Sequence, residues 1–109
     1  MARQSDSSSG APGSADADAG PVRLEARVFG MVQGVGFRYR TMGKAEELGL
    51  TGEVKNLDDG SVAVVAEGPR PQVGRLLEWL NSGHTPGQVE RVEDSRSPAH
   101  GTFQGFSAR

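Results

Sequence analysis

The sequence predicts an α+β domain in which one antiparallel sheet carries two helices on a single face. Three observations support this prediction. Residues 22–28 and 62–66 show the period-two pattern of strands, two other segments place apolar residues at helical spacing, and an Asp-Gly pair marks a turn between two strands. The expected order of elements is β-α-β-β-α-β, with room for a short fifth strand at the end.

The first half of this pattern is a strand, a glycine-rich loop and a helix. In residues 22–28 the apolar side chains alternate with Arg, Glu and Arg, as in a half-buried strand. The glycine-rich segment 30–36 follows, and apolar residues then recur at helical spacing from Phe37 to Leu48. Gly49 stands where a helix would end in a left-handed residue. The glycine loop is therefore expected to join the end of a strand to the N-terminus of a helix.

The central hairpin and the second helix carry equally local signals. Asp59-Gly60 predicts a hairpin turn between a short strand ending near Asn56 and the strand 62–66. An apolar stripe runs along the following helix, which has Pro71 near its start and Gly83 after its end. The members of the stripe are Val73, Leu76, Leu77 and Leu80.

The last strands are more weakly patterned. Val89 and Val92 indicate a fourth strand, residues 95–101 look like a looser connection, and residues 103–108 contain the apolar positions of a last strand, Phe103, Phe106 and Ala108. With two helices on one face of an antiparallel sheet, this arrangement is a ferredoxin-like sandwich.

The first 20 residues differ in composition from the rest of the chain. They contain no Val, Leu, Ile, Phe, Tyr or Trp, so they cannot bury enough apolar surface to offset the entropy of ordering. They also lack the continuous apolar core of a signal peptide. We therefore expect a disordered tail over residues 1–20 and a single domain over residues 21–109.

Charge and cysteine content narrow the function classes. The sequence has 12 Lys/Arg and 14 Asp/Glu. The tail contains one of the basic residues and three of the acidic ones, so 11 of each remain and the domain is formally neutral. A neutral domain argues against a nucleic-acid or membrane partner, and a cytoplasmic monomer is expected. Without cysteine, and with His84 and His100 far apart in the sequence, we expect no metal site and no cofactor.

The glycine-rich loop is suited to binding an anion. Glycines at 30, 34 and 36 let backbone N–H groups converge without interference from a Cβ atom. The following helix adds its N-terminal partial positive charge, and Arg38 in its first turn offers a guanidinium fork that matches phosphate oxygens. Neither the dinucleotide fingerprint nor the nucleotide P-loop occurs in the sequence. The loop thus predicts a cradle for a phosphoryl group.

Two segments resemble the motifs of the acylphosphatase family. Residues 30–38 are similar to G-x-V-Q-G-V-x-F-R, and residues 52–62 are similar to G-x-V-x-N-x-x-D-G-x-V. The resemblance extends over residues 22–109, with Glu53 standing where many relatives carry Trp. It implies metal-independent hydrolysis of acyl phosphates to a carboxylate and inorganic phosphate, which would also act as an inhibitor.

The resemblance also implies roles for individual residues. Arg38 would bind the phosphoryl group, and Asn56 would hold the attacking water. The loop amides completing the cradle would be those of Gln33, Gly34, Val35, Gly36, Phe37 and Arg38. Asp58 and Asp59 flank the hairpin glycine and are expected to form the turn, with no role as a carboxylate pair.

The residue set suits this reaction. The leaving carboxylate has a conjugate acid of pKa about 4 and needs no general acid. The phosphoryl-transfer transition state is loose, so catalysis consists mainly of positioning and electrostatic stabilisation. An amide such as that of Asn56 is no base near neutral pH, but its carbonyl can accept a hydrogen bond from water and aim it.

Two alternatives stay open at this point. The domain also resembles the acylphosphatase-like module of hydrogenase-maturation proteins, which handles carbamoyl phosphate and normally heads a much longer chain. The other alternative is a non-catalytic ferredoxin-like module that binds RNA or protein. An RNA-binding module would expose aromatic and basic residues on its central strands, whereas the strand 62–66 offers only Val and Ala.

Overall fold

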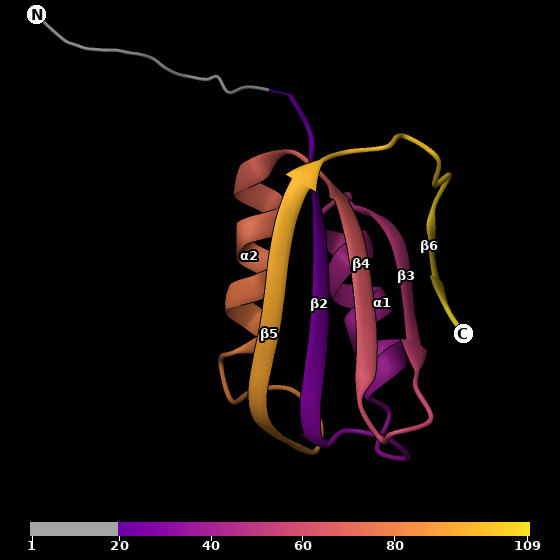
Figure 1. Cartoon of the computed structure of the whole chain (residues 1–109), viewed down its shortest axis with the longest axis vertical. Helices are drawn as coiled ribbons and strands as arrows, with labels where there is room; N and C mark the ends of the chain where they lie inside the picture. Colours follow the sequence, from indigo (N-terminus) through magenta and orange to yellow (C-terminus); the bar gives the residue numbers. More distant parts are fainter. Residues whose placement is uncertain (1–19) are drawn as a thin grey trace, which may run out of the picture.

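The computed structural model describes residues 20–109, so the predicted tail lies, except for Gly20, outside the described residues. Two helices cover one face of a five-stranded sheet in this part of the chain (Figure 1). The elements in chain order are β2 (Val22–Met31), α1 (Phe37–Glu47), β3 (Thr51–Asn56), β4 (Val62–Gly68), α2 (Arg70–Leu80), β5 (Gln88–Pro98) and β6 (Phe106–Ala108). The predicted β-α-β-β-α-β order is confirmed, and the short fifth strand is present.

The strand order in the sheet is β5-β2-β4-β3-β6. β2 pairs antiparallel with both β4 and β5, and β3 pairs antiparallel with β4. β6 pairs parallel with β3, a direction that the sequence did not predict. The direction of a three-residue edge strand depends on the route of the preceding connection, which local periodicity does not report.

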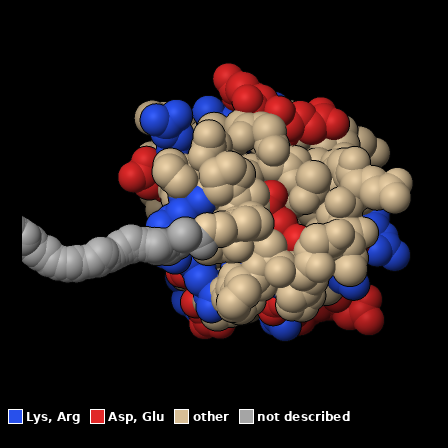
Figure 2. All heavy atoms as spheres, turned by 90° about the horizontal axis from the view of Figure 1, so that it is seen from above, with Lys and Arg blue, Asp and Glu red and all other residues tan. Residues whose placement is uncertain are grey.

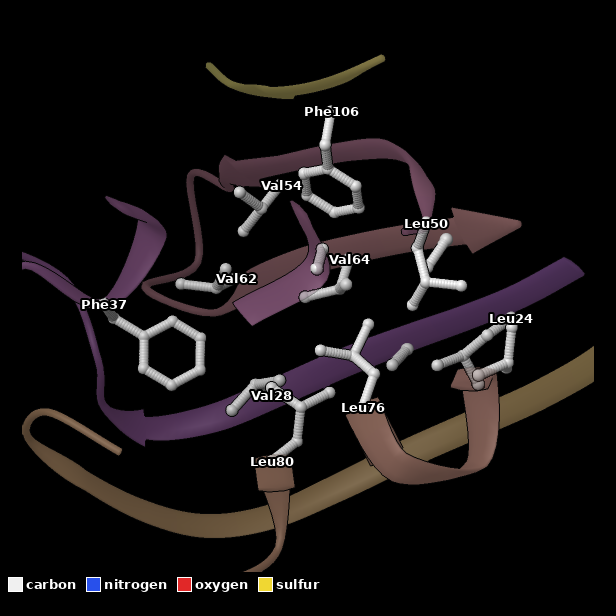
Figure 3. Packing of buried hydrophobic residues seen from close by; sticks show 14 of the residues in the cluster. Leu24, Val28, Phe37, Leu50, Val54, Val62, Val64, Leu76, Leu80 and Phe106 are labelled. Atoms are coloured by element: carbon white, nitrogen blue, oxygen red, sulfur yellow. The ribbon is translucent and has the colours of Figure 1, made fainter. Parts of the chain in front are cut away.

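The core lies between the sheet and the helices (Figure 3). The inward positions of the strands that alternation predicted are buried, among them Leu24, Val28, Val62 and Val64. They face the apolar stripe of α2 and the buried residues Phe37 and Ala45 of α1. Phe106 anchors β6 because its ring joins the core near Val54 (Figure 3).

β5 is longer than the sequence predicted. Residues 95–98, expected in a loose connection, continue the strand and pair with β2 as far as Pro98 opposite Val22. Along β5 only Val89 and Val92 are even half-buried. An edge strand with little burial needs no apolar alternation, so its true length leaves no periodic signal in the sequence.

Gly30 belongs to β2 and not to the loop in which the sequence analysis placed it. It pairs with Val89 of β5 at a shift in strand register and has a φ of 131°. A Cβ atom at this position would run into the backbone carbonyl of Gln88. Gly30 is therefore required by the close approach of two strands, and the loop that is predicted to bind an anion begins after Met31.

Charged side chains of both signs are mixed on the surface. Figure 2 looks onto the end of the molecule at which the chain enters β2, and acidic and basic groups are interspersed around its rim. This mixture agrees with the formal neutrality of the domain.

A buried carboxylate ties the connection between β5 and β6 to the sheet. Glu67 of β4 is 4% exposed and accepts hydrogen bonds from Arg23 Nη1 (2.9 Å) and from the backbone N–H groups of His100 and Gly101 (3.0 Å each). Burial by itself raises the pKa of the Glu67 carboxyl, but these hydrogen bonds and the Arg23 charge outweigh it. The pKa of Glu67 therefore lies below its usual value.

The Glu67 cluster should make the fold acid-sensitive. Since the folded-state pKa is lowered, the stability that this carboxylate contributes is present above its unfolded pKa of about 4.3 and is lost as pH falls through the folded-state value. We expect Glu67→Gln to be less stable than wild type at pH 7 and to lose less of its remaining stability on acidification. Urea unfolding from pH 7 to about pH 3 measures both effects. The exposed Glu90→Gln is the matched control, and an acid loss in Glu67→Gln equal to that of wild type would contradict the assignment.

Candidate active site

The loop between β2 and α1 presents free backbone donors at the helix N-terminus. Gly34 and Gly36 have φ values of 76° and 82°, and Gly36 is the N-cap of α1. No side chain caps this end, and the first turn contains no acidic residue that would compete with an anion. The N–H groups of the first helical turn have no partner within the helix, so the loop and helix can receive a negatively charged group.

Gln33 fastens this loop to the hairpin between β3 and β4. Its side-chain Nε2 donates to the backbone oxygens of Leu57 (2.8 Å) and Ser61 (2.9 Å). The loop and the hairpin therefore lie together at the lower end of the sheet in Figure 1. The Nε2 group of Gln33 is thus occupied in holding the loop against the hairpin.

The hairpin turn that Gln33 contacts is itself braced by Asp59. The Asp59 carboxylate accepts hydrogen bonds from the hydroxyl and the backbone N–H of Ser61. The Ser61 hydroxyl, then its N–H, hold the pKa of Asp59 below the usual value. Asp59 therefore acts within the turn, in agreement with its prediction as a turn residue.

Arg38 lies in the first turn of α1 and is tied to the far end of the chain. Its Nη1 donates to the backbone oxygen of Arg109 at 2.8 Å. The backbone N–H of Arg109 in turn donates to Val54 of β3 at 2.7 Å, and its guanidinium pairs with Glu53 at 2.6 Å. One nitrogen of the Arg38 fork is thus engaged by the chain, which orients the guanidinium and leaves other donors for a ligand.

Asn56 is the last residue of β3 and carries an unused acceptor. Its Oδ1 is buried and has no hydrogen-bond partner among the described residues. A buried acceptor without a donor costs about 1–3 kcal/mol, which the site can recover by binding a donor such as water. Asn56 lies in the chain between Val54 and Leu57. Hydrogen bonds link Val54 to Arg38 through Arg109, and a hydrogen bond links Leu57 to Gln33. The structure thus brings the predicted residues Gln33, Arg38 and Asn56 to one end of the sheet.

Sequence reasoning missed two residues of this region. The hydroxyl of Thr41, one turn beyond Arg38 in α1, is fully buried and has no partner in the described chain. In the sequence, Thr41 differs from other helix residues only in falling at the spacing of the buried positions Phe37 and Ala45. Arg109 lies beyond the last patterned strand, and nothing local in the sequence links it to Arg38.

The two histidines cannot share a ligand. His84 lies just before β5 and His100 just after it, so the length of an 11-residue strand separates them. Within residues 20–109 no group of three or more His, Cys, Asp or Glu side chains is arranged to hold a metal ion. None of the helices described is long and apolar enough to cross a membrane.

Comparisons with known proteins identify the family of this chain. The acylphosphatase family model matches residues 24–108. A curated acylphosphatase from Arthrobacter sp. (strain FB24) is 60% identical over 93 residues, which cover 84% of this chain and 85% of that protein. A solved structure of an acylphosphatase from Coxiella burnetii has a TM-score of 0.75 at 38% identity and covers 83% of this chain and 94% of that one.

A solved structure of HypF from T. kodakarensis is also similar, with a TM-score of 0.70 at 31% identity. It covers 81% of this chain but only 12% of the HypF chain. The identity to the Arthrobacter protein is far higher, and its match extends over most of both proteins. The chain described here belongs to the acylphosphatase family.

Proposed function

We propose that this chain hydrolyses acyl phosphates at the β2–α1 loop. Arg38 and the backbone amides of residues 33–38 hold the phosphoryl group, and Asn56 orients the attacking water. The class of reaction follows from membership of the acylphosphatase family. The chain acts as a cytoplasmic monomer on a small-molecule substrate, and inorganic phosphate is both product and competitive inhibitor.

The observation that carries this proposal is the unpartnered Oδ1 of Asn56 beside an uncapped helix N-terminus. The two features are complementary. One offers an acceptor for a water proton, and the other offers donors for phosphoryl oxygens. Gln33 connects the loop to the hairpin that follows β3, and Arg109 connects the helix to β3. The water and the phosphoryl group would therefore be held on one rigid frame.

The reaction needs no further functional group. The water oxygen forms a bond to phosphorus while the bond from phosphorus to the bridging oxygen breaks. The carboxylate leaves with the electron pair, and the water proton passes to a phosphoryl oxygen. Arg38 and the loop amides stabilise the charge on the phosphoryl oxygens in the transition state.

Hydrolysis of a synthetic acyl phosphate in the presence of a chelator tests the proposal. We expect turnover of benzoyl phosphate and acetyl phosphate that the chelator does not reduce, with competitive inhibition by inorganic phosphate. Absence of turnover by the folded protein would overturn the proposal in favour of a binding module. Turnover of carbamoyl phosphate alone would favour the carbamoyl-phosphate alternative.

A further inference from the structure

Three exposed apolar side chains surround the proposed phosphoryl cradle. In residues 20–109 the exposed large hydrophobic residues are Met31 (68%), Val35 (42%) and Tyr39 (63%). They lie within nine consecutive positions, at the end of β2, in the loop and in the first turn of α1. We call these three residues the apolar rim. Scattered exposed hydrophobic residues need no explanation, but residues that lie next to a proposed binding loop are candidates for contact with its ligand.

Two members of the rim meet at Gly87, and the third lies beside Arg38. Gly87, which immediately precedes β5, joins two of them, because a Cβ atom on Gly87 would lie 2.9 Å from Val35 Cγ2 and would run into the backbone oxygen of Met31. The third member, Tyr39, has its ring centre 5.6 Å from Arg38 Cζ. Tyr39 therefore borders the guanidinium that is proposed to hold the phosphoryl group, and Val35 lies in the loop that is proposed to form the cradle.

The position of the rim matches the path of the leaving group. In a phosphoryl transfer, the attacking water and the leaving oxygen lie roughly in line on opposite sides of phosphorus. Asn56, which is proposed to hold the water, is on β3. Met31 and Val35 contact the segment that leads into β5, on the other side of β2 and β4 (Figure 1). An acyl group leaving away from Asn56 would meet the β5 side of the site.

We infer that the apolar rim receives the acyl group and makes the chain selective for acyl phosphates with a large apolar acyl group, aromatic or branched. This inference rests on the proposed function. The phosphoryl oxygens are satisfied by the loop and Arg38, so the rim is free to contact the carbon skeleton. Burial of an aromatic ring against the rim removes apolar surface from water on both partners, whereas an acetyl group is too small to gain much from it.

The test compares benzoyl phosphate with acetyl phosphate. The measured quantity is the ratio of their kcat/KM values, because the intrinsic reactivity of each leaving group cancels when a variant is compared with wild type. We expect the double variant Met31→Ser/Tyr39→Ala to lower this ratio about 5- to 10-fold, mainly through benzoyl phosphate. Val35 is left intact because it lies in the loop whose conformation positions the N–H groups of the proposed cradle.

Two control variants separate a rim contact from a general loss of apolar surface. Tyr39→Phe keeps the ring and should retain the wild-type ratio. Phe103→Ala removes a half-buried aromatic ring that stacks near Arg23, at the opposite end of β2 from Met31, and should also leave the ratio unchanged. An unchanged ratio in the folded double variant would overturn the inference.

Binding measurements keep the inference independent of turnover. Benzoylphosphonate and acetylphosphonate carry the same acyl groups on a bond that is not hydrolysed, and their affinities can be measured by calorimetry. If wild type binds benzoylphosphonate more tightly and the double variant loses this preference, the rim is supported even without hydrolysis. Failure of turnover with a preserved preference would therefore count against the proposed function and not against the rim. Equal affinities of the wild-type protein for both phosphonates would overturn the inference that the apolar rim receives the acyl group.

Discussion

Replacing Arg38 with alanine should lower kcat/KM for acyl phosphate hydrolysis by about a thousandfold or more, the range found for arginines that stabilise a transferring phosphoryl group. The guanidinium supplies both a positive charge and two parallel hydrogen-bond donors. Residues 31–37, which precede it, contain no other basic side chain. The inhibition constant of inorganic phosphate should rise strongly as well. Steady-state kinetics with phosphate as competitor measures both quantities.

Three comparisons sharpen the Arg38 test. Arg38→Lys keeps the charge but loses the fork, so we expect it to recover only part of the activity. Arg40→Ala removes an exposed arginine two positions along the same helix and should behave as wild type. The folded structure should survive Arg38→Ala, since only one hydrogen bond, to the Arg109 backbone oxygen, is lost. Full activity in Arg38→Ala would refute the location of the site.

Replacing Asn56 with alanine should lower kcat about a hundredfold, the cost of misplacing a reacting group, while the inhibition constant of phosphate changes far less. The two effects separate because Asn56 is proposed to hold the water and not the phosphoryl group. Stability should equal or exceed that of wild type, since the variant loses no hydrogen bond of Oδ1 to the described chain and removes a buried acceptor that has no donor. Kinetics and urea unfolding on the same preparation test these statements together.

A control and a charged variant complete the Asn56 test. Asn81, the other asparagine of the sequence, lies at the end of α2, and Asn81→Ala should leave kcat unaffected. Asn56→Asp keeps an acceptor but adds a negative charge near the phosphoryl group, so it should also weaken phosphate inhibition. If Asn56→Ala raised the inhibition constant as much as Arg38→Ala does, the amide would be a phosphoryl ligand and the division of roles would be wrong.

The sequence predicted the elements whose order depends on local rules. Alternation identified the strands within 22–28 and 62–66, and the apolar stripe identified the second helix. Asp59-Gly60 identified the hairpin, whose aspartate indeed bonds within the turn. Each pattern arises because one face of the element is buried and the other is not, so apolar residues recur at the period of the strand or helix.

The edge strands of the sheet could not be predicted from such local patterns. β5 extends to Pro98 with almost no burial, and β6 runs parallel to β3 because of the route that the chain takes after Pro98. The role of Gly30 changed for the same reason. Its glycine requirement comes from the backbone of Gln88 on another strand, which no pattern around Gly30 could report.

By itself, the sequence determined the type of fold, the glycine-rich loop before a helix, and Arg38 and Asn56 as candidates for phosphoryl and water binding. Only the tertiary structure decided how these residues are held. The Arg38 guanidinium meets a backbone oxygen 71 positions away, and Gln33 reaches a hairpin 24 positions away. It also decided that Met31 and Val35 lie beside the segment that leads into β5. Contacts between residues so distant in the chain depend on how the strands are arranged, and local spacing carries no record of that arrangement.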